Sequence, residues 1–294
     1  MTPKDWEALE GVSKMETERF RKFLRNHPIR EIPFGEGNVT FYVGGKGAPT
    51  VLIYAGGWGG PQLGYETILA LEDRHQLIVI DVGGIDQPTD LAEITDMILD
   101  KERIDRVVLF GQSLSGILGQ VYFRQKPERV GNMLMALTPA PRKKKVKKWV
   151  LTLIRIIPIS LFRLLIAQSV KRFSRTAKPI PEEAIERMAF KGMLMARMFR
   201  SYATRRKLLC VLKLVFALNA AGDYSREELN SWPGKLLVIT SPDDPYYGDA
   251  KVLQEVFPRS EVVSLPEGYG HVTPQVHQQV FFSAIHNFLG NLKE

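Results

Sequence analysis

Ser113 lies where an apolar stretch ends, in the sequence RVVLFGQSLSG at residues 106–116. A strand that turns this sharply into a helix forces its central residue into strained backbone, so the neighbouring residues must be small. The strain projects the Ser113 hydroxyl above the sheet, where the amide of Leu114 at the helix N-terminus can stabilise an oxyanion. Ser113 is therefore a candidate nucleophile, and it needs a base that a third group holds in place.

Candidates for the base and for the third group also follow apolar stretches. His271 comes after the last of them, whereas the other histidines lie before strands or on the final helix. Asp243 and Asp244 come directly after the apolar stretch Lys235–Thr240. By position either aspartate could orient the histidine, and the remaining one would cap a turn.

The elements that must position these residues are alternating strands and helices. Continuous apolar strands separated by helices predict a mostly parallel sheet with helices on both faces, an α/β fold. In such sheets ligands bind at the carboxyl ends of the strands, where all the candidate residues lie. The predicted strands are Val39–Val43, Thr50–Tyr54, Gln76–Ile80, Arg106–Phe110, Val130–Leu137, Lys235–Thr240 and Glu261–Leu265.

Helical patterns fill the remainder of the chain. Met1–Arg25 predicts one amphipathic helix on the surface, and it has no continuous apolar stretch of the kind found in a secretory signal. Residues 141–230 contain no strand pattern and predict a helical insertion over the rim of the sheet. The predicted organisation is therefore a core formed by residues 1–140 and 231–294, with a basic helical cap at 141–230.

The stretch Gly111–Ser115 resembles the Gly-x-Ser-x-Gly nucleophile elbow of the α/β-hydrolase superfamily, with serine in place of the last glycine. The sequence SPDDP at 241–245 is similar to the family's Gly-x-x-Asp-Pro loop and aligns Asp244 with the acid. Gly270-His271 looks like the Gly-His of the same family. The resemblance covers about residues 36–140 and 231–290, and the insertion falls where the family carries its lid.

The resemblance implies a serine hydrolase with Ser113 as nucleophile, His271 as base and Asp244 as acid. The oxyanion hole would then combine the amides of Leu114 and Gly57, with Trp58 as the next choice for the second amide. Many relatives begin that loop with His-Gly, whereas this chain has Ala55-Gly56 there.

The predicted substrate is a small molecule with an apolar acyl chain, held as an ester or thioester. The pocket would include Trp58, Gln112 and Met193, although methionines at helical spacing are more often packing residues. This chemistry requires neither a metal ion nor an organic cofactor.

Positive charge is concentrated in the predicted insertion. Residues 141–213 hold 20 Lys or Arg and three acidic residues, a balance of +17, which leaves −9 for the rest of a chain whose net charge is +8. Residues 142–172 combine a lysine cluster with Trp149 and aliphatic residues, and they indicate either a lid alone or a lid that also binds an anionic membrane surface. No recognised nucleic-acid-binding motif accompanies the charge, so no nucleic-acid partner is expected.

Cys210 is the only cysteine, which excludes an intrachain disulfide and a cysteine zinc site. We therefore expect a cytoplasmic protein. The basic insertion suggests that it could also associate peripherally with a membrane.

Two alternatives to an esterase follow from the same residues. Ser115 and Ala55 depart from the family pattern, which leaves open a member of the fold that has lost its chemistry and serves as a binding or scaffold protein. An intact triad could also act on lactones or carbon–carbon bonds.

Overall fold

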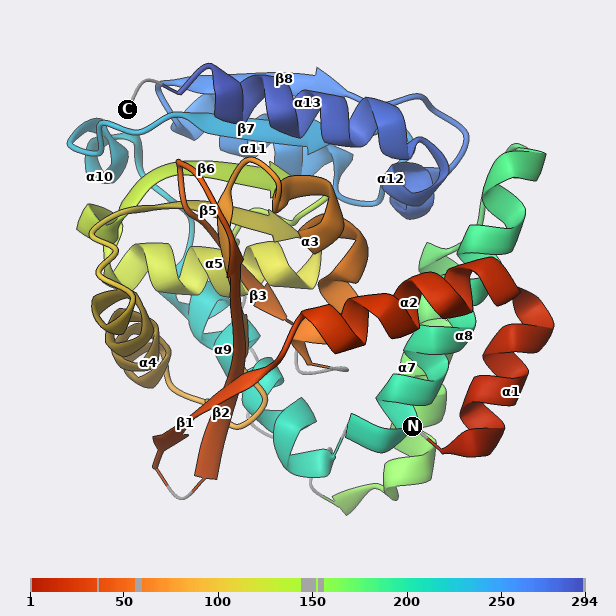
Figure 1. Ribbon diagram of the computed structural model, residues 1–294. Coiled ribbons are helices and arrows are strands. Elements are labelled where there is room, and N and C mark those ends of the chain that lie inside the picture. Colours follow the sequence, from red (N-terminus) through yellow and green to blue (C-terminus); the bar gives the residue numbers. More distant parts are fainter. Residues whose placement is uncertain are drawn as a thin grey trace.

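The computed structural model describes residues 2–35, 37–55, 60–143, 152, 156–202 and 204–292. Eight described strands form one sheet in the order β1-β2-β4-β3-β5-β6-β7-β8 (Figure 1). The strands are β1 (Arg30–Phe34), β2 (Gly37–Gly45), β3 (Val51–Ala55), β4 (Gln76–Asp81), β5 (Val107–Gln112), β6 (Val130–Ala136), β7 (Leu236–Thr240) and β8 (Ser260–Ser264). β1 and β2 pair antiparallel with their neighbours, and all other neighbouring strands are parallel.

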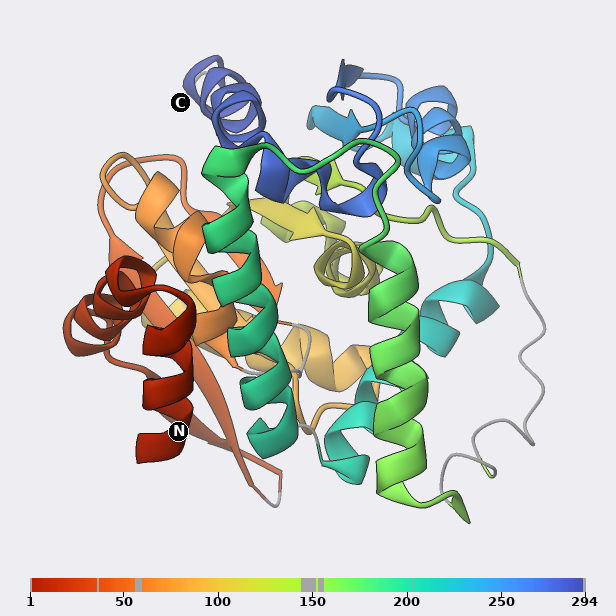
Figure 2. The ribbon, with the colours of Figure 1, turned by 90° about the vertical axis from the view of Figure 1, so that its right-hand side faces the viewer.

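Helices connect the strands and cover both faces of the sheet (Figures 1 and 2). The α-helices are α1 (Pro3–Val12), α2 (Lys14–Asn26), α3 (Tyr65–Leu71), α4 (Pro88–Lys101), α5 (Leu114–Gln125), α7 (Ile159–Phe173), α8 (Glu182–Tyr202), α9 (Arg205–Ala221), α10 (Arg226–Asn230), α11 (Tyr247–Val256), α12 (Thr273–Val276) and α13 (Gln278–Gly290). Short 3-10 helices are η1 (Pro61–Gly64), η2 (Pro127–Arg129) and η3 (Gly270–Val272).

The central strands are apolar throughout because both of their faces are buried. Ile78 and Ile80 of β4 belong to the hydrophobic cluster shared with α4, α5, α9 and α11. Leu77 and Val79 of the same strand belong to the opposite cluster, shared with α1, α2, α3, α8 and α13. Successive side chains of a strand point to opposite faces, so a sheet between two helical layers needs an apolar residue at every position. The predicted α/β fold with a mostly parallel sheet is confirmed.

The sequence did not predict β1. Its residues Arg30–Phe34 include Pro33 and two charged side chains, a composition that is typical of an edge strand and gives no apolar run. β1 pairs only with β2 among the described strands, at the end of the sheet that is remote from β8.

The prediction of a single surface helix over Met1–Arg25 is wrong. Ser13 separates α1 from α2, and its hydroxyl accepts a hydrogen bond from the Glu16 amide and so caps the second helix. Leu9, Phe20 and Phe23 are buried in the cluster that contains α8. The two helices are therefore part of the core, and Figure 1 shows them against α8.

The predicted insertion is helical where the structure describes it. Between β6 and β7 lie α7, α8, α9 and α10, and residues 144–151 and 153–155 of the predicted insertion fall outside the described residues. Leu194 on α8 and Leu214 on α9 are buried, each in a different one of the two clusters. These two helices consequently pack as parts of the core layers. No helix among the described residues is long and apolar enough to cross a membrane.

Ion pairs join α8 to the core. The Lys191 ammonium contacts the Glu66 carboxylate of α3, which also accepts a hydrogen bond from Gln278 Nε2 at 2.9 Å. The Arg197 guanidinium contacts Asp5 of α1. Burial opposes ionisation of Glu66, but the nearby charge of Lys191 and its hydrogen bond keep the pKa of the carboxyl below its usual value. Glu66 is only 5% exposed, so it relies on Lys191 to stay ionised.

Replacing Lys191 by methionine (K191M) should lower the free energy of unfolding by about 3 kcal/mol, because it removes the ammonium that contacts the buried Glu66 carboxylate. The double variant E66Q/K191M should recover most of that loss. Urea unfolding at neutral pH measures both changes. A K191M protein as stable as the unmodified chain would show that the ion pair does not hold α8.

Candidate active site

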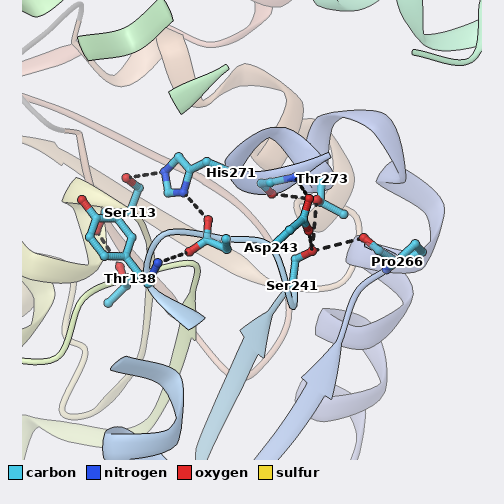
Figure 3. Close-up of polar contacts among 10 residues, drawn as sticks. Ser113, Thr138, Ser241, Asp243, Pro266, His271 and Thr273 are labelled. Carbon is cyan, nitrogen blue, oxygen red and sulfur yellow. Dashed lines mark hydrogen bonds and ion pairs between the residues drawn. The ribbon is translucent and has the colours of Figure 1, made fainter. Parts of the chain in front are cut away.

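The carboxyl ends of β5, β7 and β8 meet at one rim of the sheet. Ser113 follows β5, Asp244 lies in the turn after β7, and His271 lies in η3 after β8. Figure 3 shows the Ser113 hydroxyl and the His271 imidazole facing each other across this rim. Residues separated by up to 158 positions in the chain are thereby neighbours.

Ser113 occupies strained backbone between β5 and α5. Its φ is 54° and its ψ is −121°, a region that residues with a side chain rarely adopt. Such a conformation costs of order 1–3 kcal/mol and persists only where the surroundings enforce it. Here the Ser113 amide donates to the Ala136 carbonyl at 3.0 Å, and the Thr138 hydroxyl donates to the Ser113 carbonyl at 2.5 Å.

The close approach of strand and helix falls at Gly111 and Gly116. A Cβ at Gly111 would lie 2.3 Å from the Gly116 Cα, and a Cβ at Gly116 would lie 2.0 Å from the Thr138 hydroxyl oxygen. Ser115, which replaces the last glycine of the family pattern, contributes its backbone to this contact, since a Cβ at Gly111 would lie 2.9 Å from the Ser115 carbonyl carbon, whereas its side chain is not among the nearest atoms there. Its buried hydroxyl has no hydrogen-bond partner within the described ranges. The departure at Ser115 therefore leaves the elbow geometry intact.

A continuous hydrogen-bonded chain joins the three predicted side chains. His271 Nε2 lies 2.8 Å from Ser113 Oγ, and His271 Nδ1 lies 2.6 Å from Asp244 Oδ2. The Asp244 side chain is fully buried and that of His271 is 14% exposed. Asp244 Oδ1 accepts a further hydrogen bond from the Tyr246 amide at 2.7 Å, so both carboxylate oxygens are engaged. This geometry suits proton transfer from the serine hydroxyl to the imidazole.

The two adjacent aspartates have different partners. Asp244 faces the imidazole, whereas Asp243 Oδ2 accepts hydrogen bonds from the amides of Gly268 and Gly270 at 2.9 and 2.8 Å. Asp243 Oδ1 accepts from the Ser241 hydroxyl at 2.8 Å. Of the two candidates for orienting the histidine, the structure places Asp244 against it. Asp243 connects the turn after β7 to the loop that carries His271.

Ionisation of Asp243 follows from these contacts. Partial burial opposes the charged form, but hydrogen bonds from the Ser241 hydroxyl and from the two glycine amides hold the pKa of the carboxyl below its usual value. An anionic Asp243 is the stronger acceptor for these amides.

Tyr246 and Thr138 are neighbours of the site that the sequence analysis did not single out. The Tyr246 ring packs edge-on against the His271 ring at a centroid distance of 5.6 Å. Burial raises the pKa of Tyr246, and the charges of Asp244 and Asp249 raise it further, so its hydroxyl stays neutral. Both residues lie in segments that follow strand ends at the rim, Thr138 after β6 and Tyr246 after β7, which is the signal that could have identified them.

Of the five other residues predicted for the site, the structure describes Leu114, Gln112 and Met193. Leu114 is the first residue of α5, so its amide belongs to the turn whose N–H groups lack partners within the helix. Gln112 ends β5 directly before the serine. Met193, on α8, packs against the hydrophobic cluster to which Leu77 and Val79 of β4 belong. Gly57 and Trp58 lie outside the described residues. Within the described ranges no three His, Cys, Asp or Glu side chains are grouped as a metal site would require.

Comparisons with known proteins give the fold. No protein-family profile matches the chain, and no curated protein matches its sequence. An α/β hydrolase from a Medee basin deep-sea metagenome library superposes with a TM-score of 0.65 at 16% identity, over 90% of this chain and 98% of the other. This chain has the α/β-hydrolase fold.

Similar structures with more specific names include naproxen esterase from Bacillus subtilis, with a TM-score of 0.61 at 14% identity, over 92% of this chain and 97% of that one. A meta-cleavage product hydrolase from Pseudomonas fluorescens IP01 has a TM-score of 0.63 at 16% identity, over 89% of this chain and 97% of that one. These proteins share a fold and carry different activities, so the chemistry of this chain must be argued from its own site.

Substitutions at the elbow should separate the two small positions after the serine. Ser115→Gly restores the family pattern. It should leave the melting temperature nearly unchanged and the rate of ester hydrolysis within about twofold, since the hydroxyl has no partner among described residues. Gly116→Ala should destabilise the fold by roughly 1–3 kcal/mol, because its Cβ would collide with Thr138. Thermal unfolding and the rate of ester hydrolysis measure both. Equal effects of the two variants would contradict the assignment of the close contact to Gly116.

Asp243→Asn should make stability less dependent on pH at the acid end. The folded-state pKa of Asp243 lies below its unfolded value of about 3.9, so the carboxylate stabilises the fold above that pH and the contribution disappears as pH falls through the folded pKa. Urea unfolding should show the variant less stable than the unmodified chain at neutral pH, with the gap closing in acid. A gap that is constant with pH would mean that the Asp243 charge does not hold the loop.

Proposed function

We propose that this chain is a serine hydrolase that cleaves a carboxylic ester or thioester through an acyl-enzyme. The observation that carries the proposal is the chain of hydrogen bonds from Ser113 Oγ through His271 to Asp244, at 2.8 and 2.6 Å. A serine, an imidazole and a buried carboxylate in this arrangement are what activates a hydroxyl for attack on a carbonyl.

In the first half of the reaction, Ser113 Oγ attacks the carbonyl carbon while its proton passes to His271 Nε2. The Asp244 carboxylate accepts a hydrogen bond from the Nδ1–H of the ring, which fixes the tautomer and stabilises the imidazolium; the proton stays on the ring. Negative charge develops on the substrate oxygen, where the Leu114 amide at the start of α5 donates and the helix dipole favours an anion. The Gly57 amide is proposed as the second donor.

Collapse of the tetrahedral intermediate expels the alcohol or thiol, which takes the proton from His271. Water then enters, gives a proton to the same imidazole and attacks the acyl carbon. The second collapse releases the carboxylic acid and returns the proton to Ser113. The strained serine backbone keeps the hydroxyl in place for both attacks.

The proposed substrate has an apolar acyl chain, and the helical insertion at 141–230 is proposed as the cap over its pocket. Esterases are among the proteins of similar fold, which is consistent with this substrate class. α7 of the insertion contacts η3, the short helix that carries His271, which supports a cap beside the site.

A fluorophosphonate probe should label the unmodified chain and fail to label Ser113→Ala. The same variant should hydrolyse activated esters roughly 10⁶-fold more slowly, because the nucleophile is removed.

Asp244→Asn should lower kcat by roughly 10⁴-fold, since it loses the carboxylate that orients the imidazole.

Ser115→Ala is the matched control for the labelling, since it removes a hydroxyl only two positions away in the same turn. It should be labelled like the unmodified chain. Absence of labelling in the unmodified chain, together with no hydrolysis of esters or thioesters of any acyl length, would overturn the proposal in favour of a binding or scaffold role.

A further inference from the structure

The outer face of α7 combines exposed apolar and cationic side chains. Leu161 and Leu164 are 44% and 52% exposed in the first half of the helix. Lys171 and Arg172 near the C-terminal end, and Arg175 just beyond it, are also exposed. Spacings of three, seven and eight residues place Leu161, Leu164, Lys171 and Arg172 along one side of the helix, and Arg175 follows two residues after its end.

No acidic residue lies near this face along the chain. Residues 142–181 contain 12 Lys or Arg and no Asp or Glu. Within the part of the chain that the structure describes, Lys171, Arg172 and Arg175 form no ion pair. The charges of Lys171, Arg172 and Arg175 are therefore not neutralised by ion pairs within the described ranges.

The helix lies beside the candidate active site. Directly after α7, the amides of Ala177 and Lys178 donate to the Gly268 carbonyl at 2.8 and 2.9 Å, and the Lys178 ammonium donates to the Glu267 carbonyl at 3.0 Å. Gly268 belongs to the loop that Asp243 ties down just before His271. In Figure 2, α7 and α8 both cross the face of the molecule turned to the viewer, and Arg163 donates to the Arg200 carbonyl between them.

We propose that the outer face of α7 docks on an anionic lipid bilayer. Helices that lie in a membrane interface bury their apolar side chains at the headgroup boundary while lysine and arginine contact anionic headgroups. The exposed leucines favour a bilayer over a nucleic acid as the anionic partner. A nucleic-acid backbone would pair with the cations and leave Leu161 and Leu164 in water. A bilayer accommodates both kinds of side chain.

Docking in this position would hold the Ser113–His271 pair close to the membrane surface. The inference about substrate rests on the proposed function: the substrate would be an amphipathic ester whose acyl chain resides in the bilayer. A helix that touches both the lipid and the loop before His271 gives such a molecule a short path to the serine.

Vesicle flotation tests the docking face directly. The full chain should float with phosphatidylcholine vesicles that contain phosphatidylserine and much less with phosphatidylcholine alone, and added salt should release it. The variant K171Q/R172Q/R175Q should bind the anionic vesicles roughly 100-fold more weakly, since each basic residue near the surface contributes a factor of about five. L161S/L164S should also bind more weakly.

The matched control is K46Q/K101Q/K235Q. These three lysines are exposed, form no ion pair among described residues, and belong to the edge of the sheet opposite the active site. The control has the same net charge as the α7 variant and should bind like the unmodified chain. Equal binding to both vesicle types, or equal losses in the two triple variants, would overturn the proposal. So would capture by a heparin column without binding to vesicles.

Activity measurements connect the face to the substrate. Against an ester incorporated in anionic vesicles, the α7 variant should lose activity in parallel with its binding, whereas against a short water-soluble ester it should match the unmodified chain. Loss against both esters would contradict a docking role. Ser113→Ala should still float with the vesicles, so failure of hydrolysis and failure of docking give different results.

Discussion

The Ser113 backbone has to stay at φ 54° and ψ −121° for its hydroxyl to stand above the sheet. Several contacts act against the strain of this conformation. The Ala136 carbonyl fixes the amide, the Thr138 hydroxyl fixes the carbonyl, and α5 lies so close to β5 that only glycine fits at positions 111 and 116. Since β5 is a buried central strand, the serine is attached to the interior of the sheet and not to an exposed loop.

The histidine is held by different means. His271 lies in a short 3-10 helix after β8, outside the sheet, and the position of its loop depends on polar contacts. Asp243 accepts the amides of Gly268 and Gly270, while the chain after α7 donates to the Gly268 carbonyl from the other side. Ser113 is thus positioned by packing and His271 by charge-assisted hydrogen bonds of its loop, which weaken when the Asp243 carboxylate is protonated.

The sequence predicted the strands correctly where burial of both faces produces a continuous apolar run. β4, β5 and β7 were predicted to within about two residues because both of their faces are buried. Ser113, Asp244 and His271 lie at one rim because they follow the carboxyl ends of β5, β7 and β8. β1 and the break at Ser13 were missed because edge strands and helix caps depend on single residues. The tasks of Asp243 and Asp244, and the contact of Thr138 with the elbow, depend on three-dimensional placement that spacing does not reveal.

The turn after β7 has one further consequence. Adjacent carboxylates there face opposite partners, Asp244 towards the imidazole and Asp243 towards the backbone of a neighbouring loop. Substitutions in this turn change one partner at a time, but the gain or loss of a single residue between Ser241 and Asp244 would shift both carboxylates together and leave each facing the wrong group. Natural variants of this chain are therefore expected to vary in composition at this turn far more readily than in length.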